Sequence, residues 1–117
     1  YACEPFVTTE QGGGFVRNGK IKNIFAINSR KKTKNDEADK LLNFIWENFN
    51  MLPFALRWIT KEWEEKEARE LLDILIKKKA VQAYSVLIEV NEQRVAQAEH
   101  TFIPTESGVT VTTKALA

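Results

Sequence analysis

The chain has 117 residues, of which 44% are hydrophobic and 28% charged, and its formal net charge is +1 at pH 7. This size and balance predict one folded domain and exclude an intrinsically disordered chain. A charge so close to neutral predicts no general attraction to nucleic acid or to an anionic membrane.

The chain has a single cysteine, Cys3, which excludes an internal disulfide and favours the reducing cytoplasm. We interpret Cys3 as a small core residue. No apolar run approaches the roughly 18 residues of a membrane span. The chain starts at Tyr1, without an initiator methionine and already inside a predicted strand, so we expect a fragment of a longer protein.

Residues 1–8 are predicted to form a strand, and the glycines that follow predict a loop. Residues 15–17 and 21–27 predict two strands of a hairpin, because the Asn18-Gly19 dipeptide between them is typical of a tight turn. Residues 29–35 are polar and basic. We interpret them as a solvated connector, with contact to nucleic acid as the alternative reading.

Apolar residues then recur three and four positions apart, the spacing of amphipathic helices. The pattern predicts a helix from Asp36 to a stop at Asn50, a short helix with Pro53 in its first turn, and a third helix capped by Thr60. The predicted core of these helices is Leu41, Ile45, Trp46, Phe54, Trp58, Leu71, Leu72 and Leu75.

The remaining residues predict strands at 84–90, 94–103 and 109–113. Strands, then helices, then strands indicate an α+β fold with a helical insertion. The predicted segments are 1–34, 35–83 and 84–117.

Two short runs carry one carboxylate each, Tyr-Ala-Cys-Glu-Pro-Phe at 1–6 and Ala-Gln-Ala-Glu-His-Thr at 96–101. Side chains alternate between the two faces of a strand, so Gln97 shares a face with Glu99. A carboxylate on an inner face needs a positive partner, and a divalent metal is one such partner. On the residues alone, two solvent-facing carboxylates remain the alternative.

In this order the two runs resemble the last two ligand motifs of the methionine aminopeptidases, metallopeptidases with a pita-bread fold. Between them, residues 52–58 resemble the helical insertion of the type 2 enzymes, with the archaeal members most similar. The resemblance spans nearly the whole chain. It implies the C-terminal part of a pita-bread fold with an inserted three-helix, winged-helix-like subdomain.

The resemblance also implies roles for individual residues. Glu4 and Glu99 would be ligands of two divalent metal ions (Mn, Fe, Co or Zn), with Glu99 bridging both ions. Gln97 would lie beside the site and orient a ligand, and no residue of this chain other than the metal ligands would be catalytic. The methionine side-chain pocket would be lined by Phe6, Pro53 and Tyr84. The histidine after the second glutamate, His100, is not a ligand in the family pattern.

The family site has three more ligands, two aspartates and a histidine, and no segment of this chain matches the strands that carry them. The resemblance therefore implies a partner, the N-terminal portion of the enzyme, and an isolated chain that is inactive. The implied function is removal of the initiator methionine from nascent proteins in the cytoplasm, with no membrane and no specific nucleic acid as partner.

Two other functions stay open. A non-catalytic pita-bread relative acting as an interaction protein would lack the aspartates and the histidine upstream. A winged-helix module would place its third helix in a nucleic-acid groove. Residues 62–76, however, carry six acidic residues against two basic ones, and this excess repels phosphates.

Overall fold

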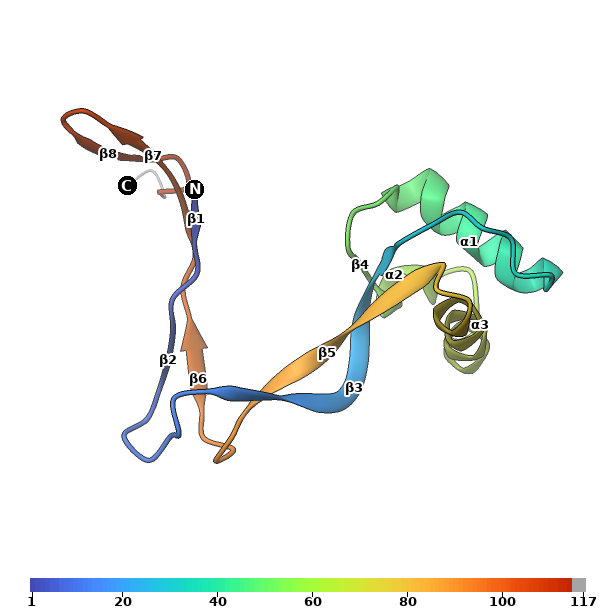
Figure 1. Ribbon diagram of the computed structural model, residues 1–117, viewed down its shortest axis with the longest axis horizontal. Helices are drawn as coiled ribbons and strands as arrows, with labels where there is room; N and C mark the ends of the chain where they lie inside the picture. Colours follow the sequence, from blue (N-terminus) through green and yellow to red (C-terminus); the bar gives the residue numbers. More distant parts are fainter. Residues whose placement is uncertain (115–117) are drawn as a thin grey trace. The chain divides into compact units, whose positions relative to one another are not determined.

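The computed structural model describes residues 1–114, which divide into two compact units (Figure 1). The helical unit is Asn18–Val86, and the strand unit is Tyr1–Arg17 together with the chain from Leu87 onward. The predicted segment boundaries at residues 34 and 83 stay a prediction. The last three residues of the predicted segment 84–117 lie outside the described residues.

The helical unit combines a three-stranded sheet, in the order β4-β3-β5, with three helices. Strands and helices together confirm a mixed α and β fold. No helix in the described part of the chain is long and apolar enough to cross a membrane. The elements are β3 (Val16–Ile27), α1 (Asp36–Phe49), β4 (Phe54–Ala55), α2 (Leu56–Ile59), α3 (Glu65–Lys77) and β5 (Val81–Glu89).

Helix α1 begins and ends where the sequence predicts. The Asn35 side chain accepts a hydrogen bond from the N–H of Ala38 at 2.9 Å, which satisfies a donor that the first turn leaves free. At the other end Asn50 adopts φ 55°, a left-handed conformation that asparagine tolerates better than most residues, and its N–H donates to Trp46.

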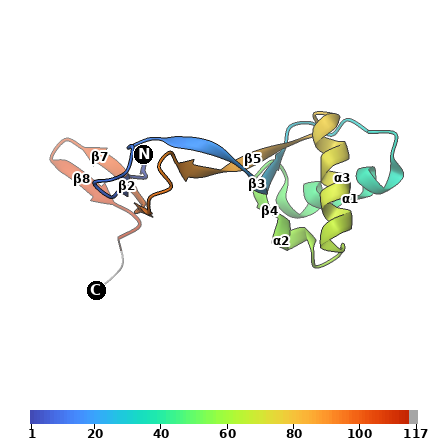
Figure 2. The same cartoon turned by 90° about the horizontal axis from the view of Figure 1, so that it is seen from below.

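The core of the helical unit lies where α1 packs against α3 (Figure 2). The apolar spacing of both helices is confirmed, because the residues predicted to face inward are buried. Two predicted core residues differ: Trp46 is only partly buried, and Trp58 is 39% exposed. The largest fully buried side chains are Leu41, Ile45, Phe54, Ile59, Leu72, Leu75 and Val81.

Three local predictions in the helical unit are wrong. Asn18 and Gly19 lie inside the continuous strand β3, and Gly19 does not take the positive φ that a tight hairpin turn requires. Pro53 precedes a short strand, β4, whose residues pair with β3, so the second helix starts only at Leu56. Thr60 ends α2, and α3 starts at Glu65 without a side-chain cap.

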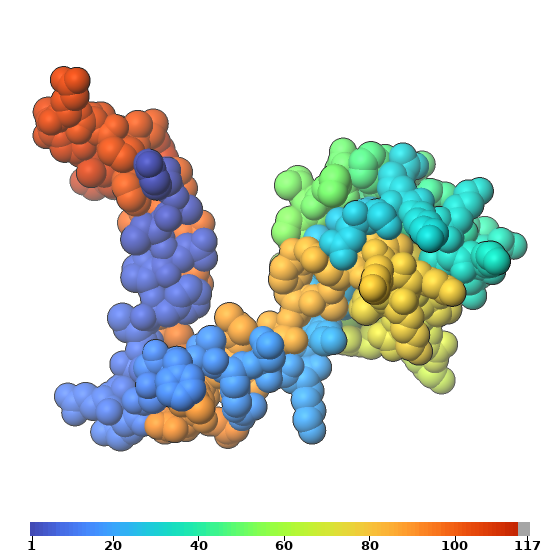
Figure 3. Space-filling view, in the orientation of Figure 1, coloured from blue at the N-terminus to red at the C-terminus, as the bar shows by residue number. Residues whose placement is uncertain are grey.

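The strand unit pairs the two ends of the chain, as Figure 3 shows for the blue N-terminal residues and the orange C-terminal ones. The predicted strands at 1–8 and 94–103 are each interrupted near the middle. Cys3 is exposed, so its assignment to the core is wrong for the described residues. The strands are β1 (Ala2–Cys3), β2 (Phe6–Thr8), β6 (Val95–Gln97), β7 (His100–Thr105) and β8 (Gly108–Val111).

Candidate metal centre

Glu4 and Glu99 lie opposite each other in the interruptions of the two strands. Before the interruption Cys3 is the partner of His100, and after it Phe6 is the partner of Gln97. The register is therefore the same on both sides. The N–H of Ala98 donates to the carbonyl of Pro5 at 3.2 Å, which continues the ladder between them. This register makes Glu4 the cross-strand partner of Glu99.

Proline explains why the ladder is interrupted at this point. Pro5 has no N–H and cannot return the hydrogen bond that it accepts from Ala98. Tyr1 and Phe102 exchange hydrogen bonds, so alternate pairs along the ladder are of the hydrogen-bonded kind. The Glu4–Glu99 pair falls between such pairs. Pairs of this second kind have Cα atoms only about 4.5 Å apart and the closer side chains.

Two carboxylates on one face of an antiparallel pair repel each other, since like charges directly opposite are unfavourable. None of the ion pairs formed by the described residues includes Glu4 or Glu99. A divalent cation would relieve this repulsion, and hard oxygen donors suit Mn²⁺, Fe²⁺, Co²⁺ or Zn²⁺. The described residues contain no cluster of three or more His, Cys, Asp or Glu side chains, so the pair supplies only part of a ligand set.

Gln97 lies on the same face and contacts Glu4. Its Nε2 donates a hydrogen bond to Oε2 of Glu4 at 3.2 Å. A side-chain amide placed in this way restricts the rotation of the carboxylate and leaves the oxygen lone pairs on the other side free.

The remaining predicted site residues are distributed over both units. Phe6 shares the face of Glu4 and is 60% exposed. His100 is on the opposite face, paired with Cys3, and its Nδ1 lies 3.1 Å from Oγ1 of Thr113. Pro53 and Tyr84 belong to the helical unit, where Pro53 is exposed and the hydroxyl of Tyr84 accepts a hydrogen bond from Gln82.

Sequence reasoning missed Glu89, a carboxylate that is only 3% exposed. It accepts hydrogen bonds from the N–H groups of Gly13, Asn91 and Gln93, and so joins the glycine loop to the turn after β5. Burial raises the pKa of Glu89, but the N–H donors of Gln93, Gly13, Asn91 and Gly14 outweigh it and hold the pKa below its usual value. No local sequence signal predicts a carboxylate bonded to a loop 76 positions away.

The hydrogen bonds to Glu89 predict that its carboxyl group titrates at an acidic pH. A carboxyl with a depressed folded-state pKa stabilises the fold above its unfolded pKa, and the stabilisation is lost as the pH falls through the lower folded value. We expect the amide proton shifts of Gly13 and Gln93 to titrate together, with a midpoint below the ordinary glutamate value of 4.5. NMR on the chain measures this. Glu89→Gln should abolish the titration, and Glu92→Gln, a change at an exposed ion pair, should leave it. A midpoint at or above 4.5 contradicts the prediction.

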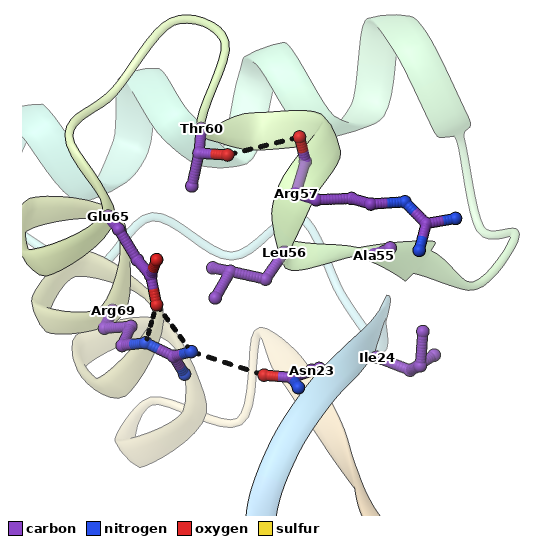
Figure 4. Close-up of a pocket in the computed structure, with 8 residues that line it drawn as sticks. All are labelled: Asn23, Ile24, Ala55, Leu56, Arg57, Thr60, Glu65 and Arg69. Atoms are coloured by element: carbon purple, nitrogen blue, oxygen red, sulfur yellow. Dashed lines mark hydrogen bonds and ion pairs between the residues drawn. The ribbon is translucent and has the colours of Figure 1, made fainter.

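A pocket of about 270 Å³ lies in the helical unit (Figure 4). Arg69, on its wall, forms a 2.8 Å ion pair with Glu65 and also donates to Asn23. The hydroxyl of Thr60 donates to the carbonyl of Arg57. The polar groups drawn in Figure 4 thus largely satisfy one another, and the pocket presents no acid–base or nucleophilic set.

No family model matches the sequence. It is 40% identical over 113 residues to a methionine aminopeptidase of Methanocaldococcus jannaschii, a match that covers 97% of this chain and 37% of the relative. The corresponding enzyme of Saccharolobus solfataricus is 40% identical over 119 residues, which cover 99% of this chain and 38% of that protein. The chain thus spans little more than a third of the length of these curated relatives.

A solved structure with a similar fold is that of a thermophilic Arx1. The TM-score is 0.75 at 19% sequence identity, and the match covers 94% of this chain and 29% of that one. At this identity the likeness shows a shared fold. The sequence matches are the stronger finding, because the two similar enzymes align with nearly all of this chain at twice that identity.

Proposed function

We propose, from the homology of this chain to the C-terminal portion of archaeal methionine aminopeptidases, that it forms part of a dinuclear-metal aminopeptidase. The enzyme would remove the initiator methionine from nascent proteins in the cytoplasm. Its other metal ligands, two aspartates and a histidine, would come from an N-terminal portion. In this proposal the helices are a winged-helix-like insertion in a pita-bread fold.

The observation that carries the proposal is the common register of β1–β7 and β2–β6, which puts Glu4 opposite Glu99 in the interruption between these strand pairs. The two residues are 95 positions apart, so only the fold brings them together. Their register also places the amide of Gln97 against Glu4. A carboxylate pair with an orienting amide and no basic partner fits a metal better than it fits an edge strand in water.

The exposed apolar side chains of the strand unit support the proposal that the chain is part of a larger enzyme. None of its described hydrophobic side chains is buried, and Phe6, Val7, Ile103 and Val109 are each more than half exposed. Paired strands without a second layer are at best marginally stable in water. The apolar side chains of this unit therefore require other polypeptide to cover them, which agrees with a chain that spans about 37% of its relatives.

Each residue has a defined task in this proposal. Glu4 and Glu99 would hold the metal ions, which when bound polarise the scissile carbonyl and lower the pKa of a metal-bound water. Gln97 fixes the orientation of the Glu4 carboxylate. Phe6 offers an apolar ring beside the carboxylates for the methionine side chain, and Pro53 and Tyr84 would line the same substrate pocket.

A chimera tests the proposal directly. The matched segment of the Methanocaldococcus jannaschii enzyme is replaced by this chain, which is 40% identical to it. We expect metal-dependent release of methionine from Met-peptides by the chimera and none from the 117-residue chain alone, because two carboxylates give too few ligands to fix two ions. The N-terminal part of the relative alone is the control.

An inactive chimera that is folded and binds metal would sink the aminopeptidase proposal and favour a non-catalytic relative. Methionine release by the isolated chain would place the site elsewhere.

A further inference from the structure

Two basic runs that are far apart in the sequence converge in the helical unit. Lysines of the 31–34 run and Lys78 line one concavity of about 240 Å³. The N–H groups of Asn28 and Ser29 both donate to the carbonyl of Ala80, and these bonds hold the two segments together. We define the basic surface as Arg30, Lys31, Lys32, Lys34, Lys77, Lys78 and Lys79, all of them exposed.

None of these seven side chains takes part in an ion pair among the described residues. Arg30 lies over the ring of Trp46 at 4.5 Å. The acids nearest in sequence, in the first turn of α1, are partly engaged, since Asp39 accepts from Thr33 and Glu37 pairs with Lys40. Seven of the 17 lysines and arginines of the chain belong to this surface, although the net charge of the chain is only +1.

Residues 29–35 expose their basic side chains, as the predicted solvated connector would, but one buried residue anchors them. Thr33 is 4% exposed, and both its N–H and its hydroxyl donate to Oδ1 of Asp39 at 2.8 Å. Lys34 and Lys79 adopt φ of 69° and 59°, left-handed values that are uncommon for lysine. The fold thus holds like charges together at some cost, and the helix dipole explains only the lysines that end α3.

We propose that the basic surface binds the phosphate backbone of duplex nucleic acid, without regard to sequence. Lysines bind phosphates as point charges and read no bases. The concavity between the two runs is lined by lysines and Thr33 and by no apolar side chain, whereas a membrane-binding face carries apolar anchors. Trp46, the aromatic ring that Arg30 covers, is partly buried, so it offers no platform for unpaired bases. The acidic start of α3 lies at the other end of that helix.

The experiment uses the whole chain and a labelled RNA duplex, with a DNA duplex of the same sequence as a second arm. Binding is followed by fluorescence anisotropy over roughly 50–200 mM salt. The test variant is Lys31→Gln, Lys32→Gln, Lys78→Gln, which spares the two left-handed lysines. The matched control is Lys20→Gln, Lys61→Gln, Lys66→Gln, which removes the same charge from exposed positions elsewhere in the unit.

We expect the chain to bind both duplexes, and the test variant to lose about 2.7 from the slope of log affinity against log salt, at roughly 0.9 per phosphate contact. The control variant should keep most of the slope.

Equal losses in both variants, or no binding at all, overturn the proposal. Tighter binding to poly-glutamate or to phosphatidylserine vesicles overturns it in favour of an acidic protein or a membrane. Unchanged thermal melting of both variants shows that the fold is intact. The result does not depend on the metal site.

Discussion

Glu99→Gln is expected to reduce methionine release by the chimera to background. Glutamine keeps the size of the side chain but removes its charge and one of its two donor oxygens, so it cannot bridge two metal ions. Glu4→Gln should have the same effect for a terminal ligand. Initial rates with a Met-peptide at saturating Mn²⁺ or Co²⁺ measure the loss, and calorimetry measures the number of ions bound.

Gln97→Ala tests whether Gln97 orients the Glu4 carboxylate without itself binding a metal ion. Gln97 donates a hydrogen bond to Glu4, so we expect its loss to weaken metal affinity by about 10–100-fold, as for other groups that orient a ligand. The melting temperature without metal should not change. Glu92→Gln, at an exposed ion pair with Arg17, is the matched control and should leave activity intact.

Full activity of the Glu99→Gln chimera would refute the ligand assignment.

Leu72→Ala is expected to destabilise the helical unit by about 2–5 kcal/mol, the range for large-to-small changes in a packed core. Leu72 is 1% exposed and belongs to the buried core of the helical unit. Urea unfolding followed by tryptophan fluorescence measures the change in the free energy of unfolding.

Leu52→Ala removes the same atoms from a side chain that is 70% exposed and should change stability by less than about 0.5 kcal/mol. If Leu72→Ala costs no more than Leu52→Ala, the buried stripe of α3 does not form the core.

The buried faces of α1 and α3 were predictable from their amphipathic spacing, and the ends of α1 were predictable from its caps. Asn35 and Asn50 bound α1 in the sequence and in the structure. The second helix was misplaced because pairing of Phe54 and Ala55 with β3 overrides the preference of Pro53 for a first turn. Local propensity also failed at Asn18-Gly19, where β3 stays paired in its sheet.

The roles of the candidate site residues stay a prediction, and their geometry was only partly predictable. Strand alternation placed Gln97 and Glu99 on one face. The register of the two strands puts Glu4 opposite Glu99. The sequence does not specify this register, because the two strands are far apart in the chain. Glu89 and the basic surface were missed for the same reason, since each depends on contacts between distant segments.

The place of the helical unit in the chain has a consequence for folding order. The ladder joins Tyr1 to Phe102, a contact across 101 positions, and closing a flexible loop of that length costs entropy. The helical unit occupies most of that loop and has its own core, so its prior folding shortens the free chain that remains to be closed. Residues such as Leu72 therefore set how readily the two glutamates meet, although none of them touches the site. A core variant of the helical unit should then slow the pairing of the strands that carry Glu4 and Glu99.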